Sequence, residues 1–291
     1  MAINKLMQAA LKALSYPDID LKRYYKLARQ VQNISQSPLI RFYKVWDHHV
    51  VRDGYEIPVR IFSPDDRLQS LPILLFFHGG GWVLGNIDNY DKACHDMARL
   101  TGHLVVSVDY RLAPEYPFPT GLLDCYHVAK EIFCDTTLLD QPADQITLIG
   151  DSAGANLAAA VSLMARDKGE FLPKRQILLY PATYNDHTEA SPFQSVQENG
   201  KNYLLTSKRI CEFMELYQSS PADRSNPYFA PLLAGDFSHQ PDTLVLTAEY
   251  DPLRDEGEAY AHRLKEAGNY VEVYRLADAL HGYLRLPVRY A

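Results

Sequence analysis

Six short runs of almost unbroken apolar residues, most of them separated by stretches of helical length, constrain this fold more than any other feature. Strands that are buried on both faces of a parallel sheet have continuous rather than alternating apolar sequences. Strand and helix in alternation indicate an α/β fold. We therefore predict a mostly parallel central sheet with helices on both faces. The predicted strands are 73–77, 104–108, 146–149, 177–180, 244–246 and 271–274, and the predicted helices are 91–100, 121–133, 154–166 and 256–267.

Length and charge narrow the classes of protein that this chain can represent. With 291 residues it can bury a large core without disulfide or metal staples. Its net charge of −7 gives no electrostatic footprint for nucleic acid or a membrane surface. The four cysteines form no C-x-x-C pair and predict reduced thiols. Without a signal peptide or an apolar run of ~20 residues, the expectation is a soluble, cytoplasmic protein.

The segment Gly150-Asp151-Ser152-Ala153-Gly154 fits the pattern G-x-S-x-G. It follows a predicted strand and precedes a predicted helix, which is the context that a nucleophilic serine on a sharp turn requires. The turn would lift the Ser152 hydroxyl out of the sheet and place the following N–H groups at a helix N-terminus, where negative charge is favoured. The structural alternative is an ordinary helix start with Ser152 as its N-cap.

A glycine-rich segment, His78-Gly79-Gly80-Gly81-Trp82, directly follows the strand predicted at 73–77. Three successive glycines leave backbone N–H groups unobstructed, and such donors stabilise the oxyanion formed in acyl transfer. A flexible turn and a phosphate-binding loop are the alternatives. A phosphate-binding loop would need Lys and Ser or Thr after the glycines, and Trp82-Val83-Leu84 fits that requirement poorly.

Two further residues follow predicted strands near the C-terminal end of the chain. Asp251 comes after the strand predicted at 243–248, and His281 comes after the strand predicted at 271–276 and a short loop. Either residue alone has an ordinary interpretation, since Asp-Pro is a turn signal and an isolated histidine is often incidental. The chain order Ser152, Asp251, His281 is nevertheless the order of serine, acid and histidine in α/β-hydrolases. The three residues are therefore the candidate catalytic triad, with Asp151 and Glu249 as neighbouring candidates.

These motifs carry a resemblance to a known family. The segments HGGGW, DYRLAPE, GDSAG, DPLRDEG and HGY resemble those of the hormone-sensitive-lipase-like family of α/β-hydrolases, from about residue 40 onward. Ser225-Asn226-Pro227-Tyr228 and the N-terminal helices look more like the bacterial acetyl esterase branch. The resemblance implies a carboxylesterase (EC 3.1.1) that hydrolyses short acyl esters, acetyl esters foremost, through an acyl-enzyme, with no metal or organic cofactor.

The resemblance also implies roles for individual residues. Ser152 would be the nucleophile, His281 the general base and then acid, and Asp251 the carboxylate that orients it. Backbone N–H groups of Gly80, Gly81 and Ala153 would form the oxyanion hole. In the oxyanion-loop motif formed by His78, Gly79 and Trp82 with the two donor glycines, His78 would shape the loop rather than catalyse.

The expected domain organisation is a catalytic domain beneath a helical cap. Residues 1–45 would form N-terminal cap helices, and 46–291 the α/β-hydrolase domain, with a cap insertion at about 183–225. Relatives usually carry a further helix after the histidine, whereas ten residues follow His281 here. The expectation is exposed apolar surface and a less firmly held His281.

Two questions stay open at the level of sequence. A small-ligand-binding or regulatory protein on the same fold is the alternative to an enzyme, although receptors derived from this family tend to lose the histidine. The oligomeric state is also open, a homodimer being one option. The expected partner is a small-molecule ester substrate, with neither nucleic acid nor membrane.

Overall fold

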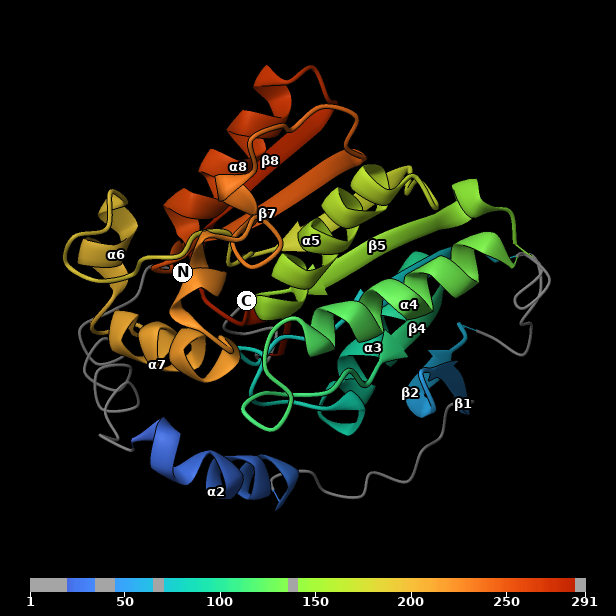
Figure 1. The fold of residues 1–291 in the computed structure, drawn as a ribbon, viewed down its shortest axis with the longest axis horizontal. Coiled ribbons are helices and arrows are strands. Elements are labelled where there is room, and N and C mark those ends of the chain that lie inside the picture. Colours follow the sequence, from blue (N-terminus) through green and yellow to red (C-terminus); the bar gives the residue numbers. More distant parts are fainter. Residues whose placement is uncertain (1–19, 35–44, 65–70, 136–140, 286–291) are drawn as a thin grey trace.

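A single twisted sheet organises the molecule (Figure 1). The computed structural model describes residues 20–34, 45–64, 71–135 and 141–285. Within these ranges the sheet has eight strands in the order β1-β2-β4-β3-β5-β6-β7-β8. The strands are β1 (Val45–Arg52), β2 (Tyr55–Phe62), β3 (Ile73–Phe77), β4 (Leu104–Val108), β5 (Ile146–Asp151), β6 (Arg175–Leu179), β7 (Asp242–Tyr250) and β8 (Val271–Leu280).

The direction of the strands follows the predicted pattern. The first strand pairs antiparallel with β2, and β2 pairs antiparallel with β4, whereas the pairings from β4 to β8 are parallel. Every residue of β3, β4 and β5 is buried, as their continuous apolar sequences indicated. The predicted α/β-hydrolase fold with a mostly parallel sheet is confirmed.

Helices cover both faces of the sheet, also as predicted. The helices α4 (Thr120–Cys134), α5 (Ala153–Lys168) and α8 (Arg254–Glu266) pack on one face and form the larger core with inward residues such as Leu75 and Leu148. The helix α3 (Ile87–Thr101) packs on the other face in a smaller core with Phe76 and Ile149. Short 3-10 turns occupy Ala143–Gln145, Pro221–Ser225, Pro231–Leu233 and Tyr283–Arg285.

The α3 face of the sheet carries an apolar groove beside that helix. Its lining includes Leu74, Met97, Ile149, Ile177 and Leu244. Residues 286–291 lie outside the described residues, so the exposed apolar surface expected from the sequence stays a prediction. The associated prediction of reduced stability stays a prediction.

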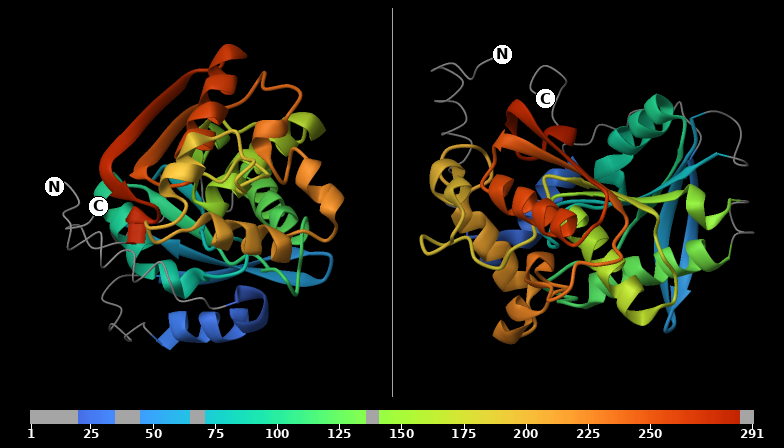
Figure 2. Two further views of the ribbon diagram at one scale, coloured as in Figure 1. Left: turned by 90° about the vertical axis from the view of Figure 1, so that its left-hand side faces the viewer. Right: turned by 90° about the horizontal axis from the view of Figure 1, so that it is seen from above.

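Three helices lie outside the two layers that sandwich the sheet (Figures 1 and 2). They are α2 (Leu21–Ile34), α6 (Gln194–Asn199) and α7 (Ser207–Tyr217). The N-terminal helix α2 contacts α7 and α3, so segments about 180 residues apart in the chain lie together. The remaining residues of the predicted N-terminal cap, 1–19 and 35–44, are outside the described ranges. In the described part of the chain no helix has the length and apolarity to span a membrane.

Several strands have bounds that differ from the prediction, and two of the differences lie next to residues of the site. Strand β6 stops at Leu179, because Tyr180 has a positive φ of 38° that leaves the sheet. Strand β8 continues to Leu280 instead of stopping near 276, since an irregularity between Ala248 and Tyr250 restores its pairing with β7. His281 therefore follows β8 directly, with no intervening loop.

Candidate active site

The turn between β5 and α5 holds Ser152 in a strained conformation. Its φ and ψ are 55° and −119°, outside the regions that an L-residue normally occupies. The surrounding backbone is so close that a Cβ on Gly154 would lie 1.9 Å from the carbonyl oxygen of Phe77. A side chain at position 154 would clash with this backbone, which explains why the second glycine of G-x-S-x-G is required.

The alternative interpretation of Ser152 as a helix N-cap is wrong. Ser152 occupies the N-cap position of α5, but its side chain makes no capping hydrogen bond. The hydroxyl instead lies 2.9 Å from Nε2 of His281. The strained turn thus directs the hydroxyl away from the helix and toward the imidazole.

The structure brings together the three residues of the candidate triad, although Ser152 and His281 are 129 positions apart. Nδ1 of His281 lies 2.7 Å from Oδ2 of Asp251. A carboxylate accepts hydrogen bonds, so this contact favours the tautomer in which Nδ1 carries the proton. Nε2 is then free to accept the hydrogen of the Ser152 hydroxyl. The Asp251 side chain is fully buried and His281 is 12% exposed, so little water competes for this chain of bonds.

The loop that carries the acid is held by its own hydrogen bonds. The amide of Leu253 donates to the second carboxylate oxygen of Asp251 at 2.9 Å. The side chain of Asn199 donates to the carbonyl of Asp251 at 3.2 Å. Glu249 accepts a 2.7 Å bond from the amide of Asp278, just before His281. Glu249 therefore restrains the end of β8 rather than the reacting groups.

The oxyanion loop passes beside Ser152, and its carbonyl groups are fixed by hydrogen bonds. Nδ1 of His78 donates to the carbonyl of Gly79 at 2.9 Å, and the amide of Leu84 donates to the carbonyl of Gly80 at 2.8 Å. Because C=O and N–H of a trans peptide point in opposite directions, these bonds also set the directions of the N–H groups of Gly80 and Gly81. His78 is thus placed to shape the loop, as the family resemblance implied.

His78 is held in its neutral form by its surroundings. The ring is fully buried and stacks on Tyr110, with 4.3 Å between ring centroids. Burial lowers the pKa of His78 below its usual value, since the imidazolium would lose its hydration. One proton on Nδ1 is sufficient for the bond to Gly79.

The buried Asp151 links the nucleophile turn to the oxyanion loop. Its carboxylate accepts hydrogen bonds from the amide of Gly79 at 2.7 Å and from the hydroxyls of Tyr90 at 2.9 Å and Tyr180 at 3.2 Å. Burial raises the pKa of Asp151, although the bonds from Tyr90 and Gly79 oppose the rise. The ring of Tyr180 also packs edge-on against His281 at 4.9 Å. One carboxylate thereby connects three segments that surround Ser152.

A pocket of about 400 Å³ opens onto Ser152 and His281. Its lining combines apolar side chains, Ile210 and Phe213 of α7 among them, with polar side chains such as Gln32 and Arg285. The apolar lining comprises Trp82, Leu84, Ala153, Ala182, Leu205, Ile210, Phe213 and Leu253.

Phe213 lines this pocket beside Gly81. Its ring lies so close to Gly81 that an added Cβ would come within 2.4 Å of it. Gly81 also has a positive φ of 62°. Glycine is therefore needed at this position both for its backbone angle and for its contact with the helix α7.

Sequence reasoning missed Tyr180, Phe213 and Arg29 as residues of the site or its support. Tyr180 had a usable signal, because it directly follows a buried strand at the same sheet edge as Ser152. Phe213 and Arg29 had none, since each reaches the site from a helix remote in sequence. Among the described residues, no group of three His, Cys, Asp or Glu side chains could hold a metal ion.

The fold and this arrangement of groups define an α/β-hydrolase-type protein, and comparison with known proteins identifies the family. Residues 74–285 match the alpha/beta hydrolase fold family. An arylesterase of Saccharolobus solfataricus is 38% identical over 242 residues, which is 83% of this chain and 77% of that protein. An ethyl acetate hydrolase of Pseudomonas putida is 36% identical over 238 residues, which is 81% of this chain and 74% of that protein.

Solved structures agree with the sequence comparison. A hyperthermophilic esterase from the archaeon Pyrobaculum calidifontis has a TM-score of 0.85 to this structure and 38% sequence identity. The alignment covers 98% of this chain and 92% of that one. The protein belongs to the hormone-sensitive-lipase-like family of α/β-hydrolases.

Proposed function

We infer that this protein is a carboxylic-ester hydrolase, and we propose that Ser152, His281 and Asp251 are its catalytic residues. The single observation that carries the proposal is the continuous chain of contacts from the Ser152 hydroxyl through His281 to Asp251, at 2.9 and 2.7 Å. A nucleophile, a base and an orienting carboxylate within hydrogen-bond reach are the parts that acyl transfer through an enzyme-bound intermediate requires.

The proposed reaction has two halves. Oγ of Ser152 attacks the ester carbonyl carbon while Nε2 of His281 takes the hydroxyl proton. The tetrahedral intermediate then breaks its carbon–oxygen bond, and His281 returns the proton to the departing alcohol oxygen. Water adds to the acyl-enzyme in the same way, losing a proton to His281, and the carboxylic acid leaves as Ser152 regains its hydrogen.

We propose that the N–H groups of Gly80, Gly81 and Ala153 stabilise the negative oxygen of both tetrahedral intermediates. The carbonyl bonds described above support this role, because they direct the two glycine amides away from His78 and Leu84. Ala153 is the first residue of α5, so its N–H belongs to the positive end of that helix. Rigid donors of this kind typically contribute about 3 kcal/mol each to stabilising the transition state.

The apolar wall of the pocket favours short acyl groups. Phe213 lies against Gly81, directly beside the position proposed for the oxyanion, and its ring supports a preference for a short acyl chain. The name of the Pseudomonas putida relative, an ethyl acetate hydrolase, agrees with a short acyl group. We therefore propose acetyl and similarly short esters as substrates.

We propose that α2, α6 and α7 belong to the cap, in agreement with the expected cap segments 1–45 and 183–225. The pocket draws Gln32 from α2 and Ile210 and Phe213 from α7, which supports a cap that shapes substrate access. Homodimer formation and a cytoplasmic location stay predictions from the sequence. Nothing in the site favours the alternative of a binding protein without catalysis.

The decisive experiment compares wild-type protein with Ser152→Ala. We expect the variant to lose hydrolysis of p-nitrophenyl acetate and labelling by a fluorophosphonate probe while keeping its circular dichroism spectrum. Ser238→Ala, in the turn before β7 and at the opposite end of that strand from Asp251, is the matched control and should keep both. Near-normal turnover by folded Ser152→Ala would refute the proposed nucleophile.

A panel of p-nitrophenyl esters from C2 to C12 tests the substrate class. We expect kcat/KM to be highest for C2 to C4 and to fall with longer chains. An optimum at C8 or longer would contradict the short-acyl proposal without affecting the triad.

A further inference from the structure

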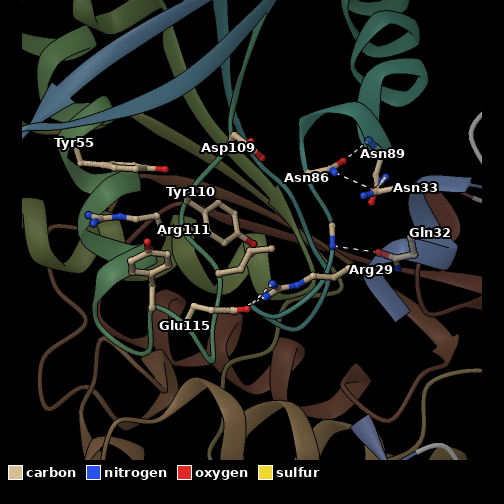
Figure 3. A pocket seen from close by; sticks show the side chains of 13 residues that line it. Arg29, Gln32, Asn33, Tyr55, Asn86, Asn89, Asp109, Tyr110, Arg111 and Glu115 are labelled. Atoms are coloured by element: carbon tan, nitrogen blue, oxygen red, sulfur yellow. Dashed lines mark hydrogen bonds and ion pairs between the residues drawn. The ribbon is translucent and has the colours of Figure 1, made fainter. Parts of the chain in front are cut away.

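Arg29 of the helix α2 reaches the catalytic domain, and Figure 3 shows its pair with Glu115. Nε of Arg29 donates to the carbonyl of Val83 at 2.7 Å, and Nη2 donates to the carbonyl of Ala113 at 2.7 Å. The same guanidinium pairs with both carboxylate oxygens of Glu115 at 3.2 and 3.1 Å. Bonds from a charged donor at such distances are about twice as strong as those between neutral groups.

Two further side chains of α2 contact the segment that follows the oxyanion glycines. The amide of Gly85 donates to Oε1 of Gln32 at 3.2 Å. The side-chain amide of Asn86 donates to Oδ1 of Asn33 at 3.1 Å, next to the Gln32 contact in Figure 3. The helix is thus in contact with residues 83–86 at three successive points.

The segment held by Arg29 controls the direction of an oxyanion-hole donor. The amides of Val83 and Leu84 both donate to the carbonyl of Gly80, at 3.2 and 2.8 Å. This carbonyl shares its peptide plane with the N–H of Gly81. A shift of residues 83 and 84 would therefore rotate that N–H.

The segment 82–84 is also bonded to the loop that contains Ala113. The amide of Ala113 donates to the carbonyl of Trp82 at 2.9 Å, next to the two carbonyls that Arg29 joins. Residues 82 and 83 are thus joined to residue 113 in two ways, by this backbone bond and by the guanidinium of Arg29, which bonds to both Val83 and Ala113. Without the guanidinium the carbonyls of Val83 and Ala113 would lose their shared donor, and a single backbone hydrogen bond would remain between the two segments.

We propose that Arg29 is a positioning residue for the oxyanion loop, acting through Val83 and Leu84 on the N–H of Gly81. This inference rests on the proposed ester hydrolase function. A positioning role can be told apart from a role of α2 in covering the pocket. Loss of a cover would alter substrate binding, whereas a misaligned oxyanion donor would raise the energy barrier to the tetrahedral intermediate.

Glu115 supports the arrangement by holding the guanidinium in place. Partial burial opposes ionisation of Glu115, but its hydrogen bonds, including those from Arg29, hold its pKa below the usual value. The carboxylate therefore stays charged at neutral pH and keeps Arg29 directed toward the two carbonyls.

The test compares Arg29→Met and Arg29→Lys with Arg23→Met, the matched control. Arg23 is exposed on the same helix, and its guanidinium lies over the ring of Tyr24 rather than on the loop. With p-nitrophenyl acetate we expect Arg29→Met to lower kcat about 10-fold with KM within 2-fold, since removing a whole oxyanion donor costs about 100-fold or more. Arg29→Lys, which keeps a charged donor, should recover part of this loss.

A second measurement reports on the oxyanion site directly. A trifluoromethyl ketone adds the oxygen of Ser152 to its carbonyl carbon and forms an oxyanion mimic, so its affinity should fall in parallel with kcat in Arg29→Met. Affinity for a neutral alcohol product should not change.

Equal kcat and ketone affinity in Arg29→Met and Arg23→Met would overturn the proposal, as would a change confined to KM. If Arg29→Met does not fold, Arg29→Lys must show the loss of kcat at unchanged circular dichroism, or the proposal fails. A wild-type protein without esterase activity or fluorophosphonate labelling would instead contradict the proposed function itself.

Discussion

The central sheet and the helix α2 differ in how much of their stability comes from apolar burial. In β3 every residue is buried and apolar. In α2 Leu21 is buried, but Leu27 and Val31 are 52% and 58% exposed, and hydrogen bonds from Arg29 add polar attachment to the domain. Burial of apolar surface is non-directional and tolerates exchange of similar residues, whereas hydrogen bonds to chosen carbonyls require one geometry. The sheet therefore provides a stable platform, and the cap provides adjustable alignment and shape.

The same contrast predicts where substitutions affect chemistry and where they affect selectivity or stability. Residues on the strand ends should determine the rate. Residues of the cap should determine which ester fits. Residues that join the two should determine how firmly the cap is attached.

The largest effect is expected for Asp251→Asn, on the sheet side of the site. An amide can donate to Nδ1 of His281 and would favour the tautomer that cannot accept the Ser152 proton, so kcat should fall about 10⁴-fold with little loss of stability. Steady-state kinetics with p-nitrophenyl acetate measures the loss. Asp242→Asn, at the other end of the same strand, should behave like wild type. A loss below 10-fold in Asp251→Asn would break the assignment of catalysis to the sheet edge.

The next effect concerns the joint between the cap insertion and the helix α8. The fully buried carboxylate of Glu256 accepts bonds from the amides of Thr183 at 2.6 Å and Tyr184 at 3.0 Å, and lies 2.5 Å from Nε2 of His187. Glu256→Ala would leave these buried groups unpaired and should lower the free energy of unfolding by about 3 kcal/mol.

Urea unfolding provides the measurement for this joint. Glu266→Ala is the control on the same helix, because Glu266 is exposed, pairs with the exposed Arg263 and should contribute about 1 kcal/mol or less. Equal destabilisation by the two substitutions would contradict the view that the cap insertion is anchored by a buried polar group.

A smaller effect, on selectivity, is expected for Phe213→Ala in α7. Removal of the ring from its contact with Gly81 should deepen the acyl pocket, so the ratio of kcat/KM for p-nitrophenyl octanoate to that for the acetate should rise about 10-fold. Lys208→Ala, exposed on the same helix, is the control. An unchanged ratio would mean that α7 does not limit acyl length.

The smallest effect is expected at the polar attachment of α2. The pKa of Glu115 is lower in the folded protein than in the unfolded chain, so its contribution to stability is present above the unfolded pKa of about 4.3 and is lost as the pH falls through the folded value. Because the pair with Arg29 is partly exposed, Glu115→Gln should cost only about 0.5 kcal/mol at neutral pH.

Urea unfolding of wild type and Glu115→Gln at several pH values tests this sign. The difference between them should shrink toward zero as the pH falls below about 4. A difference that grows on acidification would exclude a charged Glu115 as the attachment of α2.

The motifs differed in how far the sequence could predict their structure. G-x-S-x-G predicted a turn between a strand and a helix, and the structure has that turn, but the positive φ of Ser152 and the absence of a capping bond appeared only in three dimensions. Predicted strand ends failed at Tyr180 and Leu280, where a backbone irregularity and pairing with a neighbouring strand outweighed local preference. The sequence led us to expect helices within residues 1–45, and α2 lies there, but the hydrogen bonds of its polar side chains to the domain had no sequence signal.

By itself, the sequence determined the class of fold, the order of the candidate triad and the position of the glycine-rich loop, because burial in a parallel sheet and sharp turns require particular residue types at fixed spacing. Only the tertiary structure decided that Arg29 bonds to the segment after the oxyanion glycines, that Asp151 joins three segments and that Phe213 contacts Gly81. Those contacts join residues that are 29 to 132 positions apart in the chain, and no local pattern records which distant group a side chain will meet.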